Sequence, residues 1–186
     1  MGISLPVVTP RLRLRNFTRS DAEAVHAYTS DPEVVKYLDW GPDTESDTCE
    51  FISLALDRNW EMPRLMFDLA IVLSQQENPI GNGGLYVTSP RHHEGEIGYC
   101  LNRQFWGNGY ATEACLGLLR LGFEQLELHR IFALCDTENI ASQRVLQKIG
   151  MQREGQLRKH KCQWGVWKDS YLYAILTDDW QLGSNK

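Results

Sequence analysis

The feature that most constrains the fold of this chain is a change of hydrophobic period on either side of Gly107 and Gly109. Before the two glycines, residues 96–101 are typical of a strand. After them, apolar residues recur at helical spacing from Ala111 onward. Two glycines separated by one residue let the backbone approach a ligand closely, and the free N–H groups at a helix start suit a pyrophosphate. We therefore predict an anion site made of main-chain amides at residues 107–112.

The alternative is a tight hairpin, because Asn108-Gly109 is a strong two-residue turn signal. A hairpin needs a second strand with alternating polar and apolar residues. The residues after Gly109 have helical periodicity instead, so the sequence offers no such strand. This favours the phosphate loop over the hairpin.

The order of periodic segments predicts a mixed α/β fold of the α+β type. A β-α-β-α-β order begins with the strand before the glycine pair, and the sequence has no internal repeat or linker. We expect one domain over residues 1–182 and a flexible tail at 183–186. The expected strands cover residues 11–15, 66–73, 80–87, 96–101, 131–135, a stretch from 151 onward and 170–176, and the expected helices cover 18–28, 31–38, 43 or 44 to 60, a stretch from 109 onward and 139–149.

Composition narrows the classes of partner. The chain has 186 residues, of which 42% are hydrophobic and 23% charged, as in an ordinary folded domain. A net charge of -5 offers no general attraction to nucleic acid or anionic lipid, and no stretch reaches the ~18 apolar residues of a membrane span. Five cysteines without a CxxC pair indicate reduced thiols in a cytoplasmic protein and no metal site. We therefore expect neither a nucleic-acid nor a membrane partner.

The segment Gln104-x-x-Gly107-x-Gly109 matches the acetyl-CoA loop signature of the GNAT superfamily of N-acetyltransferases. Further segments resemble its RimJ/RimL branch in their order and spacing, and together they cover nearly the whole chain. These segments are residues 9–15, 96–99, 106–114, 128–131, 139–146, 148–151 and 167–173.

The resemblance implies a GNAT fold, a central, splayed, mostly antiparallel sheet flanked by helices, with acetyl-CoA as co-substrate and no metal. The pantetheine arm would lie between strands 96–101 and 131–135, and a β-bulge in the first strand would free amides near Cys100 and Leu101. The implied cofactor contacts are Cys100, Leu101, Gln104, Trp106, Gly107, Asn108, Gly109, Tyr110, Ala111, Thr112, Asn139, Ser142 and Lys148.

Members of the family transfer the acetyl group directly, so the chemistry needs a base for the amine and a proton donor for the leaving thiolate. Glu96 is our first choice for the base, although a solvated carboxylate or a structural ion pair is an equal alternative. Asp68 and Glu154 are weaker candidates. Many members carry a proton-donating tyrosine where this chain has Leu146, which leaves that role to Ser142 or to water.

The two helix residues proposed for the cofactor also have plain structural alternatives. Ser142 can bond the backbone of its own helix, and Asn139 can cap that helix.

The resemblance implies a primary amine as acceptor, and the RimJ/RimL likeness points to the N-terminal α-amine of a protein, such as a ribosomal protein. Relatives also acetylate small amines, amino acids and antibiotics, so a small-molecule acceptor stays open. Absence of the usual tyrosine also leaves open a non-catalytic acyl-CoA sensor. The hairpin that contains Lys161, Trp164 and Trp167 would border the acceptor site, in a monomer or a homodimer.

Overall fold

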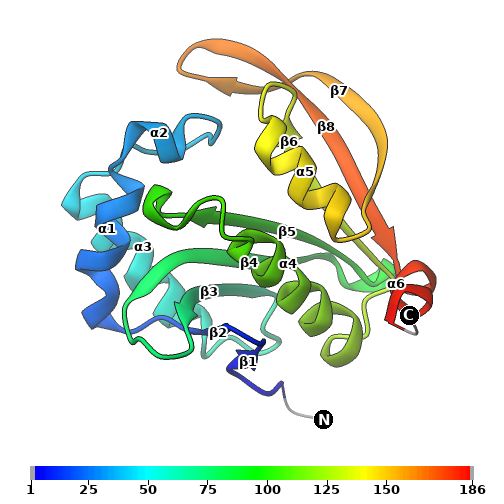
Figure 1. Ribbon diagram of the computed structural model, residues 1–186, viewed down its shortest axis with the longest axis horizontal. Helices are drawn as coiled ribbons and strands as arrows, with labels where there is room; N and C mark the ends of the chain where they lie inside the picture. Colours follow the sequence, from blue (N-terminus) through cyan, green and yellow to red (C-terminus); the bar gives the residue numbers. More distant parts are fainter. Residues whose placement is uncertain (1–2, 185–186) are drawn as a thin grey trace.

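A single eight-stranded mixed sheet organises the protein, whose computed structural model describes residues 3–184 (Figure 1). Its strand order is β1-β2-β3-β4-β5-β6-β8-β7, and every neighbouring pair is antiparallel except β5 with β6. The predicted α/β class with a mostly antiparallel sheet is confirmed. The strands are β1 Val7–Val8, β2 Leu12–Asn16, β3 Met66–Leu73, β4 Pro79–Ser89, β5 Glu94–Leu101, β6 Arg130–Asp136, β7 Gln152–Gln163 and β8 Val166–Leu176.

The helices cover the two faces of the sheet, because successive side chains of a strand point to opposite faces. Along β3, Phe67 and Ile71 pack in the core under α4 (Tyr110–Arg120) and α5 (Ile140–Lys148), while Ala70 packs in the core under α1 (Ala22–Thr29) and α3 (Glu45–Arg58). Figure 1 shows α4 and α5 together on one face. The helices are α1 Ala22–Thr29, α2 Pro32–Val35, α3 Glu45–Arg58, α4 Tyr110–Arg120, α5 Ile140–Lys148 and α6 Thr177–Ser184.

Helix starts follow the capping residues of the sequence. Asp31 accepts a hydrogen bond from the amide of Glu33, with Pro32 at the first position of α2. Thr44 and Asp47 form a reciprocal capping box at the start of α3. The ends of helices depend less on the neighbouring residues in the sequence. Helix α2 ends at Val35 rather than at residue 38.

The sheet parts between β5 and β6. These parallel strands pair only over Glu94–Glu96 with Arg130–Phe132, whereas β6 pairs with β8 along its full length. Beyond Glu96 the two strands therefore diverge, with β5 following β4 and β6 following β8. Figure 1 shows the two ribbons moving apart, and we call the region between β5 and β6 beyond Glu96 the wedge.

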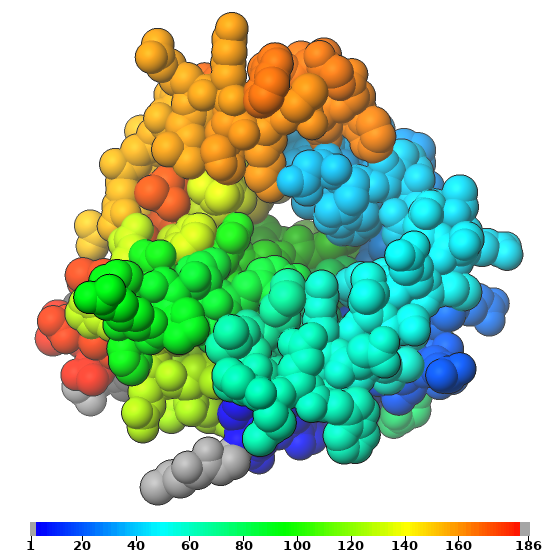
Figure 2. Space-filling model, turned by 180° about the vertical axis from the view of Figure 1, so that it is seen from behind, coloured from blue at the N-terminus to red at the C-terminus, as the bar shows by residue number. Residues whose placement is uncertain are grey.

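A long hairpin of β7 and β8 lies next to β6 and reaches the segment after α2. It turns at Trp164 and Gly165, both with positive φ, as a two-residue hairpin turn requires. Near the turn, Gln163 donates to the carbonyls of Lys36 and Leu38, at 2.8 Å to the former. Figure 2 shows an opening between this hairpin, in orange, and the segment after α2, in lighter blue.

Several segments differ from the sequence prediction. Strand β8 begins at Val166 rather than at residue 170, because its first residues pair with β7. Helix α6 was not predicted, and it includes residues 183 and 184 of the expected tail; residues 185–186 lie outside the described residues. Helix α4 continues into a π-helical turn over Leu121–Gln125.

Candidate active site

A cavity of about 570 Å³ occupies the wedge between β5 and β6 and extends over the starts of α4 and α5. Its walls also include the segment around α2. Most residues predicted from the sequence as cofactor contacts line it. These are Cys100, Leu101, Trp106, Gly107, Gly109, Tyr110, Ala111, Thr112, Asn139, Ser142 and Lys148.

The start of α4 presents unpaired main-chain donors to this cavity. Gly107 and Gly109 have φ of 77° and 79°, a left-handed conformation that favours glycine. The amide of Glu113 donates to the carbonyl of Gly109, which is the first hydrogen bond of the helix. The three amides before it, at residues 110–112, therefore have no acceptor within the helix. A Cβ at Gly107 would meet no atom within 4 Å, so a ligand has space at this turn.

Residues near the N-terminus of the chain brace the loop. Glu113 accepts hydrogen bonds from Thr9 Oγ1 at 2.7 Å and from the backbone amide and Nε of Arg11 at 2.7 and 2.6 Å. Burial raises the pKa of Glu113, but these bonds outweigh it and leave the pKa below its ordinary value. Arg11 also donates to the carbonyl of Asn108 at 3.0 Å. Arg11 and Glu113 thus connect the loop and the first turn of α4 to residues 9–11.

Two of the predicted contacts, Gln104 and Asn108, do not line the cavity. The Asn108 side chain donates to the carbonyls of Phe105 and Trp106, so it stabilises the turn itself. Trp106 in turn donates its indole N–H to the carbonyl of Leu101 at 2.8 Å. These bonds connect the loop to the end of β5.

The predicted β-bulge in the first strand is wrong. Residues 96–101 of β5 pair with β4 without a break, and the irregularity lies between Val87 and Ser89 of β4. The amide of Asn102 donates to β4, and alternate residues of a ladder point to the same side, so the amide of Cys100 also faces β4. The amide of Leu101 instead faces the wedge. Because β5 has no partner strand on the wedge side beyond Glu96, a regular strand leaves this donor free, and no bulge is needed.

The start of α5 contributes side chains from the opposite wall. Asn139 caps the helix by accepting from the amide of Ser142 at 3.0 Å, which is the structural alternative foreseen for it, and both residues line the cavity. Arg144 and Lys148, one helical turn apart, also line the cavity and supply positive charge. The hydroxyl of Tyr99, on β5, donates to Ser142 Oγ at 3.2 Å.

Glu96 lies at the last paired position before the strands part. It shares the strand face of Cys100, which packs toward α1 and α3, so it points away from the α4 side of the sheet. Burial raises the pKa of Glu96 above its ordinary value, while Lys161 lowers it and Asp39 raises it further. A carboxylate with a raised pKa at the parting point is suited to accept a proton.

The two weaker base candidates are already engaged. Asp68 is buried, pairs with Arg58 at 2.7 Å and accepts the hydroxyl of Tyr86 at 2.7 Å. Glu154 forms a two-bond ion pair with Arg130 at 2.8 and 2.6 Å. Both carboxylates are therefore structural partners.

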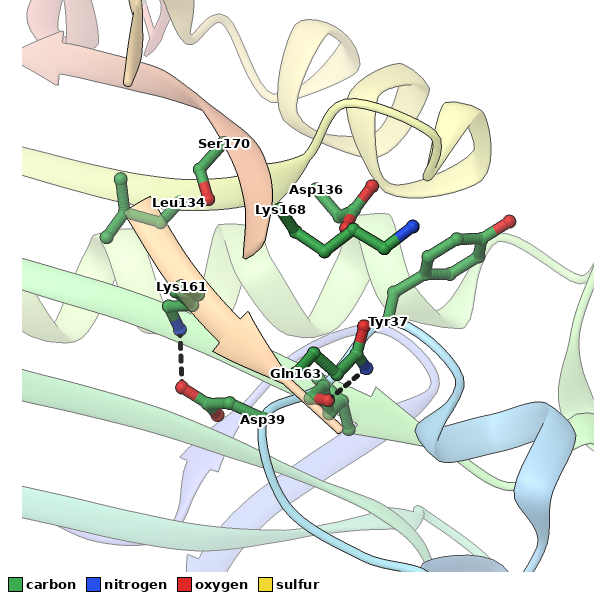
Figure 3. A pocket seen from close by; sticks show the side chains of 9 residues that line it. Tyr37, Asp39, Leu134, Asp136, Lys161, Gln163, Lys168 and Ser170 are labelled. Carbon is green, nitrogen blue, oxygen red and sulfur yellow. Dashed lines mark hydrogen bonds and ion pairs between the residues drawn. The ribbon is translucent and has the colours of Figure 1, made fainter. Parts of the chain in front are cut away.

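A small chamber of about 70 Å³ lies on the Glu96 side of β6, under the hairpin (Figure 3). Figure 3 shows Lys161 and Asp39 facing each other, and their charged atoms are 2.9 Å apart. Gln163, bonded to the segment after α2, forms part of the same wall. The chamber therefore combines paired charges with a rim at which the hairpin contacts the segment after α2.

The buried thiols are poorly suited to act as nucleophiles. Burial raises the pKa of Cys100 to about 12 and that of Cys135 to about 11, so both are neutral near pH 7. Among residues 3–184, no three His, Cys, Asp or Glu side chains gather as metal ligands would. None of the helices described is long and apolar enough to cross a membrane.

Comparison with known proteins decides the family. Residues 11–152 match the acetyltransferase (GNAT) domain family. The chain belongs to this GNAT family. The predicted resemblance to GNAT enzymes is thereby confirmed.

Three relatives show how far the similarity extends. A Bacillus subtilis protein named uncharacterized N-acetyltransferase YnaD is 38% identical and covers 94% of this chain and 98% of its own. A GNAT-family acetyltransferase structure from Bacillus anthracis superposes with a TM-score of 0.81 at 38% identity, over 92% of this chain and 98% of its own. The Escherichia coli [ribosomal protein uS5]-alanine N-acetyltransferase is 30% identical over 49% of this chain and 47% of its own.

The sequence prediction missed the groups that act across long separations. Arg11 and Glu113 were part of recognised segments, but their contact joins residues 102 positions apart. Asp39 and Gln163 lie outside every motif recognised in the sequence. Tyr99 had one usable signal: it shares a strand face with Ile97 and Leu101, and this placed it on the α5 side of the sheet.

Proposed function

We propose that this GNAT enzyme transfers the acetyl group of acetyl-CoA to a primary amine, favouring the N-terminal α-amine of a protein, such as a ribosomal protein. The observation that carries the proposal is the wedge. Free amides of α4 line it on one face of the sheet, and Glu96 lies on the opposite face, at the position where β5 and β6 part. Acetyl-CoA supplies an acetyl group activated as a thioester. The remaining steps belong to residues of this chain.

At the cofactor end, the amides of residues 110–112 would hold the diphosphate, with Arg144 and Lys148 adding positive charge. The free amide of Leu101 would hold the pantetheine arm along β5. The left-handed turn at Gly107 leaves the space that a phosphate at this position needs. The donors, the charge and the space all suit the same ligand.

At the acceptor end, Glu96 would take the proton of the amine, directly or through a water molecule. The hairpin and the segment after α2 contact each other at this rim and leave an opening between them (Figure 2), which favours an acceptor that enters end-on. A chain terminus meets this requirement. The name of the Escherichia coli relative, an alanine N-acetyltransferase for ribosomal protein uS5, supports the same class of acceptor.

The test measures CoA release by the purified protein with acetyl-CoA and a panel of amines. The panel contains N-terminal peptides of ribosomal proteins, each paired with the same peptide blocked at its N-terminus, together with polyamines and amino acids. We expect release with the free peptides only, and mass spectrometry should place the acetyl group on the α-amine. Turnover with small amines alone would contradict the proposed acceptor. Cofactor binding without turnover of any amine would favour an acyl-CoA sensor.

A further inference from the structure

A pair of hydroxyl groups connects the two walls of the wedge. Tyr99 projects from β5, Ser142 from the first turn of α5, and their oxygens are 3.2 Å apart. Both residues line the cavity that we assign to the cofactor. The contact therefore lies inside the cavity, between β5 and the helix that follows β6.

The direction of this hydrogen bond determines what Ser142 can do. Burial raises the pKa of Tyr99 well above its ordinary value, so its hydroxyl stays protonated and donates to Ser142 Oγ. The proton of Ser142 is then available to another acceptor. Within the described part of the chain, its hydroxyl makes no hydrogen bond to a backbone carbonyl.

One protein group competes for that proton. The Ser142 hydroxyl also interacts with the thiol of Cys135, and it lowers the pKa of that thiol against the larger effect of burial. The thiol remains neutral, with a pKa of about 11. A neutral thiol accepts a hydrogen bond more weakly than a sulfur that gains negative charge. Ser142 would therefore favour a leaving thiolate over Cys135.

We infer that Tyr99 is a positioning residue, which holds the Ser142 hydroxyl so that it donates a hydrogen bond to the sulfur of the leaving CoA. The inference rests on the proposed acetyl transfer. In that step the amine nitrogen bonds the acetyl carbon, and the carbon–sulfur bond breaks with its electron pair on sulfur. The amine proton passes to Glu96 and then to water, and the sulfur takes a proton from water after release.

The first test is a double-mutant cycle in the full chain. We expect Tyr99→Phe to lower kcat about tenfold and to leave KM for acetyl-CoA unchanged, because it removes a bond that matters as sulfur gains charge. Ser142→Ala should lower kcat at least as much. The double variant should equal Ser142→Ala, because Tyr99 acts through Ser142. Losses that multiply, or a change confined to KM, would overturn the inference.

The second test measures binding and needs no turnover. Kd values for CoA and for desulfo-CoA, which lacks the sulfur, are compared at pH 8.5 by calorimetry. We expect the wild type to prefer CoA about tenfold and Tyr99→Phe or Ser142→Ala to lose most of this preference. An unchanged preference in Tyr99→Phe would contradict the role. A wild type that acetylates no amine would reject the proposed function, and the Kd ratio would still decide the role of Tyr99.

Tyr173→Phe is the matched control. Tyr173 is buried in β8, and its hydroxyl has no hydrogen-bond partner among the described residues. We expect wild-type kcat and wild-type CoA preference in this variant. A loss like that of Tyr99→Phe would show that removal of any buried tyrosine hydroxyl has the same effect, and would overturn the assignment.

Discussion

The two ends of the wedge are built in different ways. The cofactor end consists mainly of main-chain amides at the start of α4, shaped by the left-handed turns at Gly107 and Gly109. The acceptor end consists of side chains that meet across long sequence distances, since Gln163 bonds carbonyls 125 and 127 residues away. One end depends on local backbone conformation, the other on tertiary contacts.

This difference separates cofactor binding from acceptor choice. Main-chain donors at α4 do not change with side-chain identity, provided that the glycines allow the turn. The acceptor end changes whenever a side chain of the hairpin or of the segment after α2 changes. A substitution at one end should therefore leave the other end's property intact, and each prediction below tests this.

The largest effect is expected at Gly109. Gly109→Val places a β-branched side chain at a φ of 79°, which L-residues rarely adopt. The turn must change, and the amides of residues 110–112 then lose their alignment. We expect acetyl-CoA affinity to fall by at least about 100-fold, as measured by calorimetry.

Gly165→Val is the control for backbone strain. Gly165 has the same φ of 79° but lies at the hairpin turn. This variant should bind acetyl-CoA like the wild type. If both variants lose affinity equally, the loss comes from backbone strain in general, and the alignment of the amides at residues 110–112 does not explain it.

The second effect is expected at Glu96. Glu96→Gln removes the base, and kcat should fall about 100-fold while Kd for acetyl-CoA stays the same. Only the ionised carboxylate accepts a proton, and burial raises its pKa, so wild-type activity should fall as pH drops through that raised pKa. The variant should lose this acid limb of the pH profile.

Glu94→Gln is the matched control for this prediction. Glu94 lies two residues away on β5 and pairs with Arg130 at 3.0 Å. We expect its activity to stay within about twofold of the wild type, since Glu94 does not line the cavity and its ion pair is partly exposed to solvent. Equal losses in both variants would argue against Glu96 as the base.

The same contrast explains what the sequence could predict. Strand β3 was predicted with its exact limits, and the loop at Gly107–Thr112 was placed by a local change of period. The start of α2 followed from Asp31 and Pro32. These features depend on neighbouring residues, whose spacing the sequence shows directly.

The missed features depend on distant partners. Strand β8 extends to Val166 because β7 pairs with it, and the amide directions on β5 follow from its pairing with β4. The contact between Tyr99 and Ser142 joins two elements 43 residues apart. No local pattern encodes which of these groups meet.

The third effect is expected at the rim. Gln163→Leu leaves the carbonyls of Lys36 and Leu38 without their donor, which costs about 1–3 kcal/mol of unfolding free energy. The hairpin should then separate from the segment after α2, and KM for the acceptor should rise several-fold with unchanged acetyl-CoA affinity. Denaturant unfolding and steady-state kinetics measure the two effects. Gln152→Leu, at an exposed position of β7, should change neither; a rise in acetyl-CoA Kd in Gln163→Leu would break the separation of the two ends.

The smallest effect is expected at Lys161, whose charge lowers the pKa of Glu96 while Asp39 raises it. Lys161→Met removes the positive charge and leaves Asp39 without its partner at 2.9 Å. Both changes favour the protonated form of Glu96, so the acid limb of kcat/KM should move to higher pH. We expect a loss of about threefold at pH 6 and none at pH 9, where Glu96 is ionised in either protein. A loss of equal size at both pH values would mean that Lys161 acts by shaping the rim, and the electrostatic coupling to Glu96 would be rejected.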